Sequence, residues 1–86
     1  MCTEAEIRTL LKALHDQPVL AQRGFSFRVE NGQHLLALRG PHLRGVWRCE
    51  DGEFAWTAAG YGVSTHAVRG VDAALRYTLV ALATSS

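Results

Sequence analysis

Histidine and cysteine are the side chains of this chain that could hold a metal ion. The candidate ligands are His15, His34, His42, His66 and Cys49. Zinc sites in proteins usually draw their ligands in pairs that are separated by a few residues in the sequence. None of these residues has such a spacing to another, so we predict no metal site and no cofactor.

A serine or cysteine beside a histidine could supply a nucleophile with its general base. Here the possible pairs join Cys49 or Ser64 to His42 or His66. Each nucleophile has a simpler expected role, because Cys49 falls on the core face of a strand, where a thiol is inert, and Ser64 suits a helix N-cap. We therefore predict no catalytic residue and no enzyme. A pocket near His42, Tyr61 and His66 is the alternative, and it would make the chain a small ligand-binding protein or enzyme.

Arginine is the other residue type with chemistry to offer, because its planar fork binds carboxylate and phosphate groups. Eight of the nine lysines and arginines are arginine, although the formal net charge is only +1. Residues 23–48 hold five arginines and one acid, for a net charge of +4, whereas residues 49–68 hold three acids and no lysine or arginine, for −3. A nucleic-acid-binding domain that uses Arg28, Arg39, Arg44 and Arg48 is therefore one functional alternative.

These side chains must be positioned by elements that the sequence pattern indicates. A helix is predicted from Thr3 to His15, where Thr3 and Glu6 have the spacing of a capping box. Its apolar stripe consists of Ile7, Leu10, Leu11 and Leu14. Pro18 prevents the helix from continuing.

Two dipeptides predict β-hairpins in the middle of the chain. Asn31-Gly32 and Asp51-Gly52 suit the two central positions of a type I′ turn, which both require positive φ. The second hairpin, from Val46 to Thr57, then places Trp47 opposite Trp56, so a facing tryptophan pair is expected on the core face.

In the first hairpin, from Phe25 to Arg39, a loop of two residues would set the strand register and so determine which side chains lie on each face. The predicted core face is Phe25, Phe27, Val29, His34, Leu36 and Leu38. The predicted outer face of the sheet combines arginines with small or apolar residues, which resembles the composition of an interface. Its members are Arg28, Arg39, Arg48, Leu35, Ala37, Val46, Ala55 and Thr57.

The last helix is apolar around most of its circumference. It ends near Ala83, and it begins either near Ser64 or only after Gly70. One sheet covers one side of such a helix, so we expect a second copy of the chain to cover the rest.

These elements predict a single α+β domain over residues 1–86. The expected fold is a two-layer sandwich, helix–four-stranded antiparallel meander–helix, with both helices on one sheet face. The expected core is Ile7, Leu10, Leu14, Phe25, Phe27, Leu36, Leu38, Trp47, Phe54, Trp56, Leu75 and Leu79.

Two loops are similar to those of double-stranded RNA-binding domains. The segments are Gly40-Pro41-His42 and Gly60-Tyr61-Gly62-Val63-Ser64, and the resemblance covers about half of the chain. It implies a helix–sheet–helix fold and duplex RNA as the partner. Where that family has paired lysines that grip phosphate, this chain has Thr65 and His66, so the function does not follow from the resemblance.

The sequence therefore favours a non-catalytic protein-interaction or regulatory module that forms a homodimer or binds another protein. The candidate interaction surface consists of Arg28, Leu35, Arg39, His42, Arg44, Arg48, Tyr61 and Tyr77. Nucleic acid is a possible partner that the pattern does not favour. The longest apolar run, from Leu79 to Ala83, is too short to cross a membrane, so a cytoplasmic location without membrane contact is expected. The two cysteines, Cys2 and Cys49, are too few and too far apart for a disulfide framework.

Overall fold

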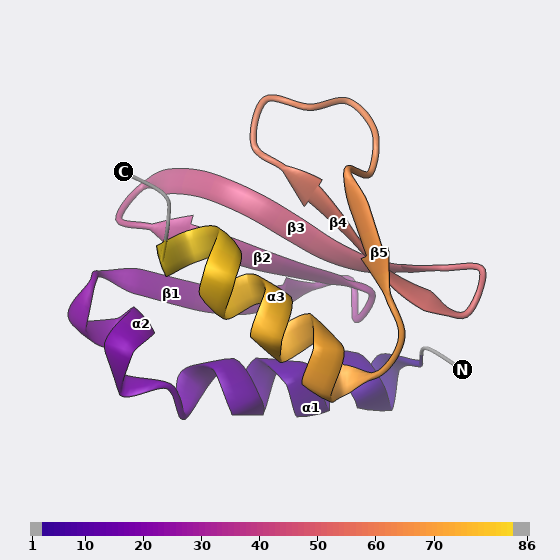
Figure 1. The fold of residues 1–86 in the computed structure, drawn as a ribbon, viewed down its shortest axis with the longest axis horizontal. Coiled ribbons are helices and arrows are strands. Elements are labelled where there is room, and N and C mark those ends of the chain that lie inside the picture. The colour runs from indigo at the N-terminus through magenta and orange to yellow at the C-terminus, as the bar shows by residue number, and fades with distance from the viewer. Residues whose placement is uncertain (1–2, 84–86) are drawn as a thin grey trace.

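The computed structural model describes residues 3–83, so Cys2 lies outside the described residues. The elements follow in the order α1 (Glu4–His15), α2 (Pro18–Gln22), β1 (Phe25–Glu30), β2 (His34–Arg39), β3 (His42–Glu50), β4 (Glu53–Ala58), β5 (His66–Val68) and α3 (Val71–Ala83). The strands form one antiparallel sheet in the order β1-β2-β3-β4-β5, and the helices lie together on one side of it (Figure 1). This confirms the α+β meander, with five strands where we predicted four.

The helix α1 begins where the capping box predicts. The backbone N–H of Glu6 donates to Thr3 Oγ1 at 3.3 Å, which satisfies one of the amide groups left unpaired at a helix start. Ile7, Leu10 and Leu14 are buried against the sheet. Pro18 ends this helical run as expected, but it also starts the short helix α2, because proline is well suited to the first helical position.

The register of the first hairpin differs from the prediction. Asn31 and Gly32 do adopt positive φ (56° and 66°), and the N–H of Gln33 donates to the Glu30 carbonyl at 3.3 Å, as in a type I′ turn. The strand pairing, however, resumes one residue later, with Glu30 opposite His34. Because side chains alternate between faces, this single extra residue turns all of β2 over.

The shift corrects several predicted positions. Leu35 and Ala37 lie in the core and not on the outer face, and Arg39 lies on the helix side, over the ring of Phe25. Conversely, Leu36 and Leu38 are half-buried on the helix-free face, together with His34. The Leu35 side chain is fully buried, so it cannot be part of an interaction surface.

The second hairpin has the predicted register. Asp51 and Gly52 have positive φ, and Trp47 lies opposite Trp56. Both indoles are buried beneath the helices, with 0% and 3% of their surface exposed, and their rings are 5.1 Å apart. The inward placement of the tryptophans is therefore confirmed.

The segment before α3 forms the additional strand. The N–H and the hydroxyl of Thr65 both donate to the Trp56 carbonyl, at 2.8 and 3.3 Å, and the chain then pairs with β4 as far as Val68. Gly70 has a φ of +86°, which a helix interior does not accept. The last helix therefore begins at Val71, and neither Ser64 nor Thr65 caps it.

The packing of α3 also differs in detail. Its fully buried side chains are Ala74, Thr78 and Leu82, whereas Leu75 and Leu79 are only partly buried against the core. The helix α1 packs along α3 within the same chain (Figure 1). Much of the apolar surface that we expected a second copy to cover is therefore covered by α1 and the sheet.

Candidate functional site

A hollow of about 510 Å³ lies at the end of the sheet where β2 turns into β3. It is lined by Arg23, Gly24, Arg39, Gly40, His42 and Arg44. We call the four basic side chains of this hollow, Arg23, Arg39, His42 and Arg44, the basic basin. None of the described residues that line it is acidic. Three of the four belong to the predicted interaction surface, and the structure brings them together.

Neutral groups hold two of the guanidinium groups in the basin. Arg23 Nη1 donates to the carbonyl oxygen of Ala83 at 2.9 Å, so this cation also stabilises the C-terminal end of α3. The guanidinium carbon of Arg39 lies 5.5 Å from the centre of the Phe25 ring, a distance at which a cation is attracted to an aromatic face.

An irregularity in β3 places Arg44. Between the pairs Ala37–Gly45 and Leu38–Leu43, the strand β3 has one residue more than β2, and that residue is Arg44. Such a bulge changes the direction of a side chain and increases the local twist. Arg44 consequently lines both the basin and a neighbouring hollow of about 300 Å³. The other residues around that second hollow are Trp56, Ala58, Ala59, Tyr77, Ala81 and Leu82.

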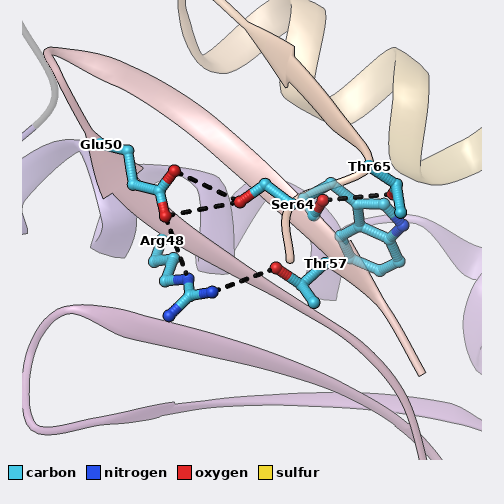
Figure 2. Close-up of polar contacts among 6 residues, drawn as sticks. Arg48, Glu50, Thr57, Ser64 and Thr65 are labelled. Atoms are coloured by element: carbon cyan, nitrogen blue, oxygen red, sulfur yellow. Dashed lines mark hydrogen bonds and ion pairs between the residues drawn. The ribbon is translucent and has the colours of Figure 1, made fainter. Parts of the chain in front are cut away.

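The helix-free face carries a polar network at the β4–β5 end (Figure 2). Ser64 donates a hydrogen bond to the two Glu50 carboxylate oxygens, at 3.4 and 3.2 Å. Glu50 Oε1 lies 3.6 Å from Arg48 Nε, and Arg48 Nη2 donates to Thr57 Oγ1 at 3.3 Å. Since Glu50 is on β3 and Ser64 precedes β5, this network ties the loop of residues 59–65 across β4.

Arg28 is paired in the same way as Arg48. Its Nη2 lies 3.3 Å from Glu30 Oε1 on the same strand. Both arginines that do lie on the helix-free face are therefore partly neutralised by a neighbouring glutamate. The predicted set of four nucleic-acid-binding arginines is divided between two surfaces, with Arg39 and Arg44 in the basin.

An aliphatic patch occupies the centre of the helix-free face. We call Leu36, Leu38, Leu43 and Val46 the outer patch; they form the cross-strand pairs Leu36–Val46 and Leu38–Leu43. Leu43 is the most open of the four, with 45% of its surface exposed. The loop of residues 59–65 stands out from the sheet on the side opposite the helices (Figure 1), and its Tyr61 and Val63 are strongly exposed.

The remaining predicted residues have other surroundings. Tyr77 is half-buried against Trp47 and Trp56, and the His66 ring stacks on it at 4.2 Å with an angle of 8°. No described hollow is lined by two of the trio His42, Tyr61 and His66. Of the trio, His42 lines the basin, and Tyr61 and His66 line none of the four described hollows.

Cys49 and Ser64 have roles that differ from the predicted ones. Cys49 is disulfide-bonded, so the expectation of an inert thiol at this position is wrong. Ser64 donates to Glu50 and does not cap a helix. Within residues 3–83, no group of three or more histidine, cysteine, aspartate or glutamate side chains is arranged to hold a metal ion.

Sequence reasoning missed Arg23 and Leu43. Arg23 follows the helix α2, which we did not predict, and Leu43 falls between the two hairpins that we predicted, Phe25 to Arg39 and Val46 to Thr57. The proline at the start of α2 was the one available signal for the first of these.

Comparison with protein-family models, curated proteins and solved structures finds no match to this chain. None of the helices in the described part of the chain combines the length and hydropathy that crossing a membrane requires.

Proposed function

We propose that this chain is a non-catalytic interaction module that self-associates through the helix-free face of its sheet. The observation that carries the proposal is the outer patch, four aliphatic side chains side by side on a face that no helix covers. The water-exposed face of a sheet usually carries polar side chains, because apolar and polar residues alternate along each strand. A cluster of apolar side chains on such a face marks an interaction site.

A second copy of the chain is the occupant that the charges favour. The patch is flanked by Arg28 and Glu30 on β1 and by Arg48 and Glu50 on β3, so the face carries both signs of charge. In a two-fold symmetric dimer, the same surface meets itself, and mixed charges allow an arginine of one copy to approach a glutamate of the other. A purely basic face would repel its own copy.

The support for an enzyme is weaker. Cys49 is disulfide-bonded and Ser64 donates to Glu50, and only His42 of the predicted histidine–tyrosine trio lines one of the four described hollows. The cytoplasm remains the compartment that we propose from composition, although the disulfide at Cys49 is of a kind that persists mainly in oxidising compartments.

The oligomeric state of three single-site variants tests this proposal. Leu43→Lys introduces a charge into the outer patch, and we expect it to weaken dimerisation at least about tenfold, which corresponds to about 1.4 kcal/mol. Val19→Lys on α2 is the matched control, because Val19 and Leu43 have nearly equal exposure (43% and 45%). Val80→Lys places the same charge on the exposed side of α3. Sedimentation equilibrium provides the association constants.

The three variants separate the two surfaces named for association. Loss of the dimer in Leu43→Lys alone supports the helix-free face. Loss in Val80→Lys alone assigns the interface to the last helix and contradicts the proposal. A wild-type chain that stays monomeric at every concentration also contradicts it.

A further inference from the structure

We infer that the loop of residues 59–65 is a dimerisation arm, whose Tyr61 and Val63 pack against the outer patch of a second copy. This inference rests on the self-association proposed above, and it specifies which part of the chain reaches across the interface. Three properties of the arm support it: the exposure of its apolar side chains, the way its ends are held, and its place beside the outer patch.

Tyr61 and Val63 are the most exposed large hydrophobic side chains in the described part of the chain, at 64% and 71%. They lie two residues apart on one loop, which stands on the same side of the sheet as the outer patch (Figure 1). A single exposed apolar residue is common on a protein surface, whereas apolar side chains that gather beside an apolar patch mark an interaction site. Tyrosine is also enriched in protein interfaces.

Hydrogen bonds tie both ends of the arm to β3. At its start, the N–H of Ala59 donates to the Arg44 carbonyl at 3.0 Å. Near its end, the Ser64 hydroxyl donates to the Glu50 carboxylate (Figure 2). The apolar tip between these two anchors is therefore held in place before a partner binds, which lowers the conformational entropy that binding costs.

The arm forms a ridge over β4 on the helix-free face. Ala55 of β4 is paired with Arg48 on this face and is buried there, although no helix covers it. The outer patch belongs to β2 and β3 and lies beside this ridge. Two such faces can meet only if each ridge falls on the ridge-free part of the other. A two-fold axis that runs along β3 gives this arrangement, because it places the β4 side of one copy over the β2 side of the other.

The charges of the chain also fit a second copy. The formal net charge is only +1, so two copies repel each other little. The arm contains no lysine, arginine, aspartate or glutamate. It can therefore cover the leucines of the partner without bringing a charge into the interface, which would be costly to desolvate. At the far side of the patch, Arg28 is already paired with Glu30.

Val63→Ser and Val80→Ser form a matched pair, because both replace a strongly exposed valine (71% and 63%) by the same residue. We expect Tyr61→Ser to weaken dimerisation at least about tenfold, Val63→Ser at least about fivefold and Val80→Ser less than about twofold. Sedimentation equilibrium measures the dissociation constants. The urea-unfolding midpoint of each variant shows whether a loss of the dimer is a loss of folding.

A photochemical cross-link locates the arm on the second copy. A chain that carries p-benzoylphenylalanine in place of Tyr61 is mixed with the ¹⁵N-labelled wild-type chain and irradiated, and the cross-linked peptides are identified by mass spectrometry. We expect peptides that join an unlabelled arm to labelled residues 34–46, the part of β2 and β3 that holds the outer patch.

The possible results separate the arm from the interface itself. If Leu43→Lys disrupts the dimer while Tyr61→Ser and Val63→Ser leave it intact, the arm is refuted and the proposed function stands. Equal weakening by Val63→Ser and Val80→Ser refutes the arm as well, and so do cross-links that stay within one chain or join the arm to α3 of the other. A wild-type chain that is monomeric at every concentration refutes both proposals.

Discussion

At the scale of single residues, the hydroxyl of Thr78 is fully buried, so its hydrogen-bond partners must lie inside the protein. Trp47 Nε1–H donates to Thr78 Oγ1 at 2.8 Å, and the same hydroxyl donates to the Ala74 carbonyl at 2.7 Å. Trp47 and Thr78 are both inaccessible to solvent. A buried indole N–H without an acceptor costs free energy, so Thr78 allows a tryptophan to fill the centre of the core.

Thr78→Val should therefore lower the free energy of unfolding by about 1–3 kcal/mol, because it removes the acceptor and keeps the shape. Thr9→Val is the matched control, since the Thr9 hydroxyl donates to the Ala5 carbonyl in the same i−4 arrangement at an exposed site (2.9 Å). We expect its effect to stay within about 0.5 kcal/mol. Urea unfolding of both variants provides the comparison, and equal effects would contradict the role of the buried hydrogen bond.

At the scale of elements, the close approach of the Trp56 ring to β3 depends on Gly45. A Cβ atom at Gly45 would lie 2.2 Å from Trp56 Cζ2, which is far inside van der Waals contact. Gly45 also stands next to the bulge that places Arg44, opposite Ala37. Because Gly45 has no side chain, the Trp56 indole can pack directly on the backbone of β3. The packing of the core and the position of Arg44 in the basin therefore both depend on the backbone around Gly45.

Gly45→Ala should destabilise the protein by about 1–3 kcal/mol, the usual cost of overpacking a core. Gly62→Ala is the control, because a Cβ atom there meets nothing within 4 Å and its φ is not in the left-handed region. Near-UV circular dichroism and urea unfolding report the tryptophan environment and the stability. An unchanged tryptophan spectrum in Gly45→Ala would show that the ring moves aside at little cost.

At the scale of the whole molecule, an aromatic cluster joins the sheet to α3. The Trp47 ring packs against those of Phe54, Trp56 and Tyr77 at 6.1, 5.1 and 5.8 Å. Edge-on and tilted contacts of this kind add to the free energy of burial. This cluster therefore joins β3 and β4 to α3, while Ile7, Leu10 and Leu14 of α1 are buried in the same core.

The tryptophan fluorescence of the native protein should accordingly be blue-shifted relative to the unfolded chain and almost insensitive to iodide. The reason is that Trp47 and Trp56 are buried under the helices. Stern–Volmer quenching measures this, with the urea-unfolded chain as the reference. Free quenching in the native state would reverse the assignment of the two sheet faces, and with it the location of the outer patch.

Local chemistry in the sequence determined the features that depend on a few neighbouring residues. Asp51-Gly52 specifies its turn because positive φ is required at both positions, and the tryptophan pair follows from that register. The N-terminal capping by Thr3 is equally local. The alternating pattern of β3 and β4 permitted only one face to be the core.

The tertiary structure decided the first hairpin, because residues 34–39 are apolar on both faces and either register buries leucine. In the observed register, Leu35 lies opposite Trp47 of β3. The basic basin also needed the fold, since Arg23 is far in sequence from Arg39 and Arg44, and a single bulged residue places the last of these. Side-chain alternation and turn preferences act over a few residues, whereas a site made of two separate segments, residues 23–24 and 39–44, exists only once the sheet and helices have packed.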